Sequence, residues 1–216
     1  MPVNDPQVSS NIKHTAFGHS SIGCYQINLG KGELATANVS QCLAESDGSL
    51  LAFFQEPYVT RSGKIPSTGG LQVFSATGPR AAIVASPDLK VWSMPSYTTS
   101  DVVACTWITG SALCPEIILI SVYADINKDA VPQELKHIMY HCNNRNVPML
   151  ICADSNAHSI LWGSPVNNGR GDSYEEFIAG NNLGILNEGN MPTFETSRAR
   201  SLLHIITFVI CLQIGE

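Results

Sequence analysis

Short apolar runs alternate with polar segments rich in glycine, proline and serine along most of this chain. Apolar runs of four to eight residues bounded by turn residues are typical of buried strands. The pattern predicts strands over residues 24–28, 50–55, 81–85, 91–94, 102–108, 117–123, 150–153, 183–186 and 202–209. Residues 61–70 carry Gly, Ser, Thr and Pro instead, and this composition predicts a loop.

Three segments between these runs indicate helices. Residues 33–45 place apolar side chains at roughly helical spacing, residues 132–142 begin with a proline, which helix starts allow, and residues 173–180 form the third. No repeat or linker divides the chain, so we predict one domain over 21–216, preceded by a flexible, polar segment over 1–20. Strands and helices mixed in this order favour an α/β or α+β sandwich with a mixed sheet.

Composition narrows the class of partner. The 216 residues carry 12 Lys and Arg against 18 Asp and Glu, a formal net charge of −6. Phosphate neutralisation by cations supplies most non-specific DNA affinity, so a broad basic DNA-binding face is excluded. A nuclease is not excluded, because metal-binding carboxylates add negative charge of their own. The seven scattered cysteines form no CxxC pair, and we expect them to be reduced and buried in an intracellular protein that does not contact a membrane.

Polar side chains directly follow four of the predicted strands. Asn28, Glu56, Tyr123 and Asp154 each end an apolar run and begin a loop. Ligands bind at strand ends in layered sheets, where a rigid backbone holds side chains that face a cleft. The last of these ends continues as Asp154-Ser155-Asn156-Ala157-His158, which adds an amide and an imidazole.

This set has the chemistry of a metal-assisted phosphodiesterase. Glu56 is a hard oxygen ligand of the kind that Mg²⁺ prefers, and Asp154 could bind the same ion or deprotonate the attacking water. Asn28 and Asn156 could donate hydrogen bonds to phosphate oxygens, and Tyr123 could steady the phosphate or the nucleophile. The alternative is that both asparagines cap turns and the tyrosine belongs to the core.

Two further residues are candidates for substrate binding. His158 could contact a phosphate or could only position its loop. Arg170, within Asn168-Gly169-Arg170-Gly171, could contact the DNA backbone or form a surface salt bridge. Trp162 is expected to anchor the loop by packing rather than to stack on a base.

Several motifs in a fixed order resemble the endonuclease domain of non-LTR retrotransposons, within the endonuclease/exonuclease/phosphatase superfamily that includes the apurinic/apyrimidinic endonucleases. The motifs are Gln26-Ile27-Asn28-Leu29, Phe54-Gln55-Glu56-Pro57-Tyr58, Ser121-Val122-Tyr123, Asp154-Ser155-Asn156-Ala157-His158-Ser159, Leu161-Trp162-Gly163, Asn168-Gly169-Arg170-Gly171, Leu186-Asn187-Glu188-Gly189 and Pro192-Thr193-Phe194. The resemblance covers about residues 23–208.

The resemblance implies a four-layered, DNase I-like α/β sandwich, with two mixed sheets flanked by helices. It implies Mg²⁺, with Mn²⁺ as the alternative, with Glu56 as the metal ligand and Asp154 among the residues that handle the phosphate and the attacking water. Asn28, Asn156 and Tyr123 would complete the catalytic set, and the reaction would be nicking of DNA to leave a 3′-hydroxyl that primes reverse transcription. A reverse transcriptase in the parent polyprotein, and action in the nucleus on chromosomal DNA, are the corresponding partner and location.

The resemblance breaks near the C-terminus. The family places an Asp inside an apolar strand where this chain has Leu202-Leu203-His204-Ile205-Ile206-Thr207-Phe208, so the position holds Ile205 or His204. The family's following Ser-Asp-His motif has no counterpart before Glu216, and we expect the last strands to be missing. We therefore expect impaired turnover, with a catalytically dead remnant of the fold, or a phosphoesterase acting on another phosphate ester, as alternatives.

Overall fold

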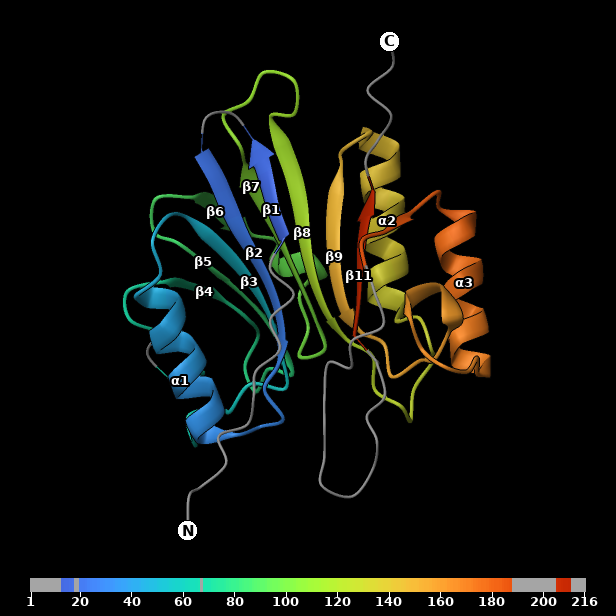
Figure 1. The fold of residues 1–216 in the computed structure, drawn as a ribbon, viewed down its shortest axis with the longest axis horizontal. Helices are drawn as coiled ribbons and strands as arrows, with labels where there is room; N and C mark the ends of the chain where they lie inside the picture. The colour runs from blue at the N-terminus through green and yellow to red at the C-terminus, as the bar shows by residue number, and fades with distance from the viewer. Residues whose placement is uncertain (1–12, 18–19, 67, 188–204, 211–216) are drawn as a thin grey trace.

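Two β-sheets face one another and helices cover their outer faces (Figure 1). The computed structural model describes residues 13–17, 20–66, 68–187 and 205–210. The first sheet has the order β1 (Lys13–Phe17), β2 (Ser20–Asn28), β3 (Leu50–Gln55), β5 (Ala81–Ala85) and β4 (Gln72–Phe74). The second has the order β10 (Gly184–Ile185), β11 (Ile205–Ile210), β9 (Met149–Asp154), β8 (Glu116–Tyr123), β7 (Val102–Ile108) and β6 (Lys90–Ser93).

The helices complete a sandwich of four layers. Helix α1 (Glu33–Ala44) lies outside the first sheet, and α2 (Gln133–Arg145) and α3 (Gly169–Gly180) lie outside the second (Figure 1). Two short 3₁₀ helices, η1 (Pro95–Tyr97) and η2 (Ile160–Trp162), lie in connections. The predicted four-layered α/β sandwich with two mixed sheets is confirmed.

Alternation along the strands builds three apolar layers. In β3 every residue is buried, because Leu51 and Phe53 point between the sheets while Leu50 and Phe54 point toward α1. In β8, Leu119 packs between the sheets in the same way. A strand covered on both faces reads as a continuous apolar run, which is why these segments could be identified from the sequence.

Two matching βαβ units set the position of the site. Strands β2 and β3 are parallel and joined through α1, and β8 and β9 are parallel and joined through α2. Their registers pair Asn28 with Gln55, directly before Glu56, and Tyr123 with Asp154. The carboxyl ends of parallel strands share one sheet edge, so each sheet brings two of the predicted site residues to that edge.

A buried polar bridge joins the sheets just inside this edge. The Gln55 Nε2 atom donates to Ser121 Oγ at 3.0 Å and to the Cys152 carbonyl at 3.3 Å. The Ser121 hydroxyl donates in turn to the Phe54 carbonyl at 3.2 Å. A buried polar group that lost its partner would cost about 1–3 kcal/mol, so these bonds favour one relative placement of the two sheet edges.

The structure differs from the sequence predictions in several details. Within the segment 1–20, which we expected to be flexible, Lys13–Phe17 forms β1 and pairs with β2. The three-residue strand β4 was not predicted, and α3 begins four residues before the predicted start because Asn168 caps it. Residues 202–204 of the last predicted strand lie outside the described residues.

The cysteine and membrane predictions have separate outcomes. The six cysteines in the described ranges are free thiols, as expected, but Cys42 is exposed on α1, so the prediction of general burial is wrong there. Burial raises the pKa of the Cys105 thiol to about 12, and this side chain behaves as part of the core. None of the helices described in the structure is long and apolar enough to cross a membrane.

Candidate active site

A side-chain hydrogen bond joins the two sheets at the predicted edge. The Nδ2 atom of Asn28, at the end of β2, donates to Oδ2 of Asp154, at the end of β9, over 2.5 Å. The Oδ1 atom of Asn28 accepts the backbone N–H of Gly30 at 2.8 Å. The carbonyl side of the amide is therefore held by the turn, and the nitrogen side faces the carboxylate.

Asp154 is the buried carboxylate of the site. The residue is only 4% exposed, and its Oδ1 atom accepts a hydrogen bond from the backbone N–H of Asn156 at 3.3 Å. Burial raises the pKa of Asp154 to about 6, the hydrogen bonds from Asn28 and Asn156 oppose that shift, and the charge of Glu56 adds to it. A carboxylate with its pKa near 6 is suited to accept a proton at neutral pH.

Glu56 supplies the second carboxylate from a strained backbone. Its φ of 46° lies in the left-handed region, which is unfavourable for a residue with a Cβ. The conformation is held by two backbone hydrogen bonds, from Glu56 N–H to the Arg80 carbonyl at 2.8 Å and from Lys31 N–H to the Glu56 carbonyl at 2.7 Å. The Lys31 Nζ atom lies 3.1 Å from Glu56 Oε1. Such strain clusters at functional sites, where the surrounding structure maintains it.

Asn156 has a comparable backbone conformation, with φ of 47°. Its Nδ2 atom donates to the Ala124 carbonyl at 3.1 Å, which uses one of its two N–H donors. The sequence prediction that it donates to phosphate stays a prediction, with the second N–H as the remaining donor.

Tyr123 ends β8 beside these groups. Burial raises the pKa of its phenol to about 12, and the charges of Glu56 and Asp154 add to the rise. The guanidinium carbon of Arg80 lies 5.0 Å from the centre of the tyrosine ring. The phenol is therefore a neutral O–H group at physiological pH, able to donate a hydrogen bond.

The two predicted substrate-binding residues have contacts within the protein. The Nδ1 atom of His158 lies 3.0 Å from Ser164 Oγ. The guanidinium of Arg170 donates to the carbonyls of Lys128 at 2.8 Å and of Ser155 at 3.3 Å. Arg170 thus fastens the loop after β8 to the loop after β9, and a DNA contact by either residue stays a prediction. Trp162 is buried, and its indole N–H donates to the Ala157 carbonyl at 3.3 Å, which confirms its packing role.

The Asn-Gly-Arg-Gly motif closes the loop after β9. The Oδ1 atom of Asn168 accepts the backbone N–H groups of Gly171 at 2.8 Å and of His158 at 3.1 Å, and thereby caps α3. A Cβ atom added to Gly171 would lie 1.9 Å from the His158 carbonyl oxygen. The helix can approach the site loop this closely only because position 171 is glycine.

Gly171→Ala is therefore expected to lower the free energy of unfolding by about 1–3 kcal/mol, the usual cost of overpacking. The measurement is urea denaturation followed by circular dichroism. Gly180→Ala is the matched control on the same helix, because nothing lies within 4 Å of an added Cβ there. Equal midpoints for both variants would show that the α3 start can move away from His158.

Sequence reasoning missed a charged cluster beside the site. The cluster consists of Arg80, Asp101, Asp125 and Lys128. Arg80 directly precedes β5 and Asp101 directly precedes β7, and both strands run antiparallel to a neighbour that ends at the site. The start of an antiparallel strand lies at the same edge as the end of its neighbour, and no apolar pattern in the sequence marks such a start as part of the site.

Two carboxylates form the donor set available to a divalent cation. Within the described ranges, His, Cys, Asp and Glu side chains form no group of three or more suited to a metal. Mg²⁺ commonly keeps several waters and uses one or two protein carboxylates, so Glu56 and Asp154 fit this ion better than a closed structural metal site. Burial is the main cause of the raised pKa of Asp154, and a cation near both groups would relieve the smaller contribution that comes from the charge of Glu56.

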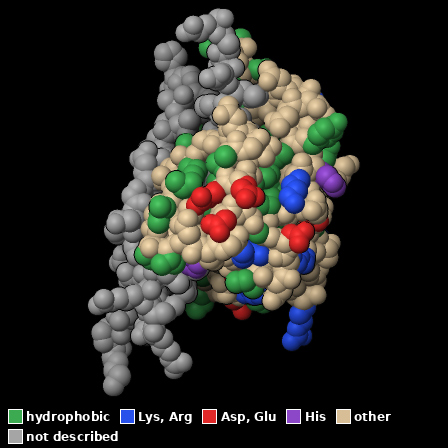
Figure 2. Space-filling model, turned by 90° about the vertical axis from the view of Figure 1, so that its right-hand side faces the viewer, with side chains coloured by type: hydrophobic (Ala, Val, Ile, Leu, Met, Phe, Trp, Pro, Cys, Tyr) green, Lys and Arg blue, Asp and Glu red, His purple; other side chains and the backbone are tan. Residues whose placement is uncertain are grey.

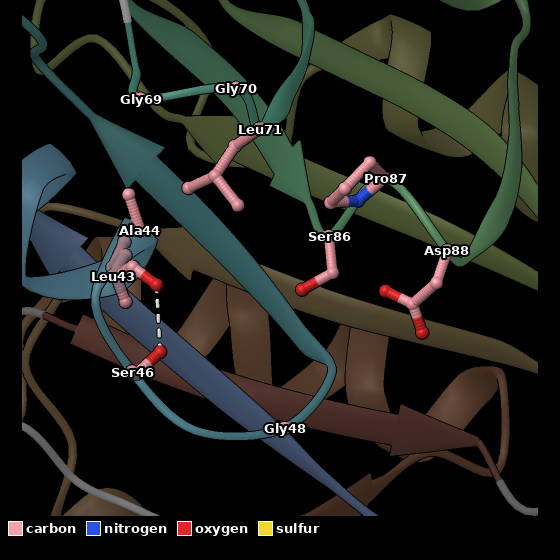
Figure 3. A pocket seen from close by; sticks show the side chains of 10 residues that line it. All are labelled: Leu43, Ala44, Ser46, Gly48, Gly69, Gly70, Leu71, Ser86, Pro87 and Asp88. Atoms are coloured by element: carbon pink, nitrogen blue, oxygen red, sulfur yellow. Dashed lines mark hydrogen bonds between the residues drawn. The ribbon is translucent and has the colours of Figure 1, made fainter.

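Other surfaces of the molecule have different features. Figure 2 shows the side covered by α3. Acidic side chains lie among Lys and Arg side chains there, so the visible part of this face is not continuously basic. A cavity of about 240 Å³ lies at the opposite end of β3 from Glu56, between the end of α1 and residues 86–88 (Figure 3). It is remote from the carboxylates and is separate from the candidate active site.

Two facing mixed sheets, with paired Asn and Asp side chains and a strained Glu at their shared edge, define the class of DNase I-like phosphoesterases. A family model described as endonuclease-reverse transcriptase matches residues 117–209. The structure is similar to the endonuclease domain of TRAS1, a telomere-specific non-LTR retrotransposon, with a TM-score of 0.71, 30% identity and coverage of 86% of this chain and 84% of that chain. The chain belongs to the family of non-LTR retrotransposon endonuclease domains.

Two further comparisons concern a longer relative and the shared fold. The chain is 25% identical over 185 residues to a putative 115 kDa protein in the type-1 retrotransposable element R1DM of Drosophila melanogaster, and the match covers 82% of this chain. It spans 18% of the length of that relative. An AP endonuclease from Archaeoglobus fulgidus has a TM-score of 0.56 at 13% identity, over 86% of this chain and 85% of the other, and shows the shared fold.

Proposed function

We propose that this domain is a Mg²⁺-dependent DNA endonuclease that nicks target DNA by hydrolysis of a phosphodiester. The observation that carries the proposal is the Asn28–Asp154 hydrogen bond, which joins the two sheets at the edge that Glu56 also reaches. An intact arrangement of this kind would supply a proton acceptor, an oriented amide and a cation ligand within one site.

In this proposal Asp154 accepts the proton of the attacking water, and its orientation is fixed by the Asn28 amide and the Asn156 backbone N–H. The neutral Tyr123 phenol and the second Asn156 N–H donate to phosphate oxygens, whose charge grows in the transition state. Glu56 would hold Mg²⁺, with Mn²⁺ as the alternative, and sharing of that ion by Asp154 is the alternative to its role as proton acceptor. When bound, the cation supplies charge stabilisation for the phosphoryl oxygens and the leaving group.

The proposal extends to the context of the domain. Because the Drosophila relative is a retrotransposon protein much longer than this chain, we propose that the parent polyprotein also carries a reverse transcriptase. A 3′-hydroxyl left by nicking would prime that enzyme, and the corresponding place of action is the nucleus. The net charge of −6 supports local contact with DNA rather than an extended basic interface.

The test is nicking of supercoiled plasmid by the purified chain with Mg²⁺, with EDTA and Asp154→Ala as controls. Open-circular product that requires both the cation and Asp154 supports the proposal. Nicking that persists in EDTA or in Asp154→Ala would contradict the proposed site.

We also propose that turnover is impaired because the residue paired with Asp154 in the neighbouring strand is not a carboxylate. The register of β11 against β9 pairs Ile205 with Asp154, whereas the resembled family carries a carboxylate in this strand. One general acid or base contributes about 10²–10⁴-fold to a rate, so its loss is a large effect.

Ile205→Asp is expected to raise the nicking rate at least about tenfold, a fraction of what one catalytic group contributes. The measurement is the initial rate of plasmid nicking at saturating Mg²⁺. Ile205→Asn is the matched control, since it has the size and polarity of aspartate without its charge. A rate that falls equally in both variants would show that this register position is apolar by structural need.

A further inference from the structure

Arg80 touches both halves of the candidate active site. It directly precedes β5 in the first sheet, and its backbone carbonyl accepts the N–H of Glu56 at 2.8 Å. Its guanidinium carbon lies 5.0 Å from the ring centre of Tyr123, which ends β8 in the second sheet. One residue therefore contacts the backbone of the proposed metal ligand and the aromatic face of the proposed phosphate donor.

Three hydrogen bonds fix the guanidinium in this position. Its Nε and Nη2 atoms donate to the two carboxylate oxygens of Asp101 at 2.6 and 2.5 Å, and Nη1 donates to Asp125 Oδ2 at 2.6 Å. A bidentate pair restricts orientation as well as distance, which a lysine ammonium cannot reproduce. The arginine side chain is only 28% exposed, so solvent screens these contacts less than it screens a surface pair.

The acidic partners of Arg80 also belong to the surroundings of Tyr123. The backbone N–H of Tyr123 donates to the Asp101 carbonyl at 2.8 Å, and Asp125 lies two residues further along the chain. Lys128 contributes a second cation to Asp101, with Nζ 2.8 Å from Oδ2. The cluster therefore contacts the tyrosine at its backbone N–H and at its ring face, and includes a residue of the loop that follows it.

A cation over an aromatic face is attracted by the ring quadrupole and limits the tilt of the ring. Two contacts thus determine where the Tyr123 hydroxyl lies, the hydrogen bond of its backbone N–H and the Arg80 guanidinium on its ring. The same arginine, through its carbonyl, maintains the left-handed backbone of Glu56. A displacement of about 1 Å in a reacting geometry costs roughly 10²-fold in rate, so a residue with this placement has leverage over catalysis.

We propose that the Arg80 side chain is a positioning group of the endonuclease site, which sets the place of the Tyr123 hydroxyl relative to Glu56, whose backbone N–H the same residue binds through its carbonyl. The proposal rests on the proposed function and adds a side chain that acts through Tyr123. The competing view is an ion pair that supports only the fold, like the pair between Arg145 and Glu116.

A double-mutant cycle separates the two views. The nicking rates of Arg80→Ala, Tyr123→Phe and the double variant are compared with that of the original chain, and Arg145→Ala is the matched arginine control. Arg80→Ala is expected to lower the rate about 10²-fold. In the Tyr123→Phe background the same change is expected to have a clearly smaller effect, because contacting residues are not additive. Equal factors in both backgrounds, or a loss no larger than that of Arg145→Ala, would overturn the proposal.

Two further variants guard against misfolding. Arg80→Lys keeps the charge but loses the fork that binds Asp101, and Arg80→Gln keeps most of the length without the charge. Both are expected to fold with unchanged circular dichroism and to nick more slowly than the original chain. If Arg80→Lys nicks at the original rate, orientation by the bidentate pair is not required and the proposal is overturned.

A spectroscopic arm works without turnover and so distinguishes failure of this proposal from failure of the proposed function. The chain is labelled with 3-fluorotyrosine, and Tyr123→Phe assigns the resonance of that ring. Arg80→Ala is expected to shift the Tyr123 resonance, whereas Arg145→Ala leaves it in place. If the original chain does not nick with Mg²⁺, the proposed function fails. An unshifted Tyr123 resonance overturns the Arg80 proposal whether or not the chain nicks.

Discussion

Replacing Asp154 with asparagine is expected to lower the rate of plasmid nicking by about 10²–10⁴-fold, the usual contribution of one general acid or base. The amide keeps the size of the carboxylate and an oxygen that can accept from Asn28 Nδ2, so the bond between the sheets can persist. It cannot accept the proton of water and lacks the charge that holds a cation. The measurement is the initial rate of conversion of supercoiled to open-circular plasmid at pH 7.5 with Mg²⁺.

The contrast with Asn28→Ala sharpens this result. That variant leaves the Asp154 carboxylate in place and removes one hydrogen bond that orients it. Its rate is expected to fall less than that of Asp154→Asn, because orientation is lost while the proton acceptor stays. An Asp154→Asn chain that nicks within a few-fold of the original rate would remove Asp154 from the mechanism.

Asp154→Asn is also expected to stabilise the fold at neutral pH in the absence of divalent cations. The native pKa of Asp154 is raised from 3.8 to about 6, so between these values the folded chain binds more protons than the unfolded chain. Stability therefore falls as pH rises through this window, and the loss is complete above about pH 6. A shift of this size corresponds to about 3 kcal/mol, a loss that the uncharged amide of the Asp154→Asn variant would not suffer.

Urea midpoints at pH 4, 6 and 8 in EDTA measure this effect. The original chain is expected to lose stability between pH 4 and pH 6 relative to Asp154→Asn, and the difference then stays constant to pH 8. Asp101→Asn is the control for which the opposite change, a lower free energy of unfolding, is expected. Burial raises the pKa of Asp101, but hydrogen bonds from Arg80 and Lys128 outweigh it and lower the pKa, so this charge stabilises the fold. Parallel pH profiles for the original chain and Asp154→Asn would contradict a buried, repelled carboxylate at position 154.

The sequence was sufficient for most of the strands and for the residues that end them. Strands β3, β5, β7 and β8 are buried on both faces, and their apolar runs carry that burial directly in the sequence. The parallel pairing of β8 with β9 then brings Tyr123 beside Asp154. That pairing joins distant segments of the chain, so the apolar pattern alone does not predict it.

Other parts of the site carried no such signal. Arg80 and Asp101 stand at strand starts, and only the antiparallel registers of β5 and β7 bring them to the edge that Glu56 and Tyr123 reach. Strand β1 was missed because it is an outermost strand of its sheet, and the pairing of such a strand depends on backbone hydrogen bonds rather than on apolar side chains. Gly171 belongs to a motif visible in the sequence, but the reason for a glycine at this position, the close approach of α3 to the His158 carbonyl, exists only in three dimensions.

The Gln55–Ser121 bridge has a consequence for how activity is lost. Because the proposed catalytic groups come from both sheets and the bridge lies between them, neither sheet alone contains the whole candidate site. A partly folded form that kept one sheet intact would retain secondary structure and lose the reaction entirely. Heat, denaturant or a core mutation should therefore abolish the proposed activity at the point where the two sheets separate. The residual activity is then proportional to the fraction of molecules in which the two sheets remain packed together. Comparing this fraction with the loss of secondary structure would show whether the two sheets unfold cooperatively.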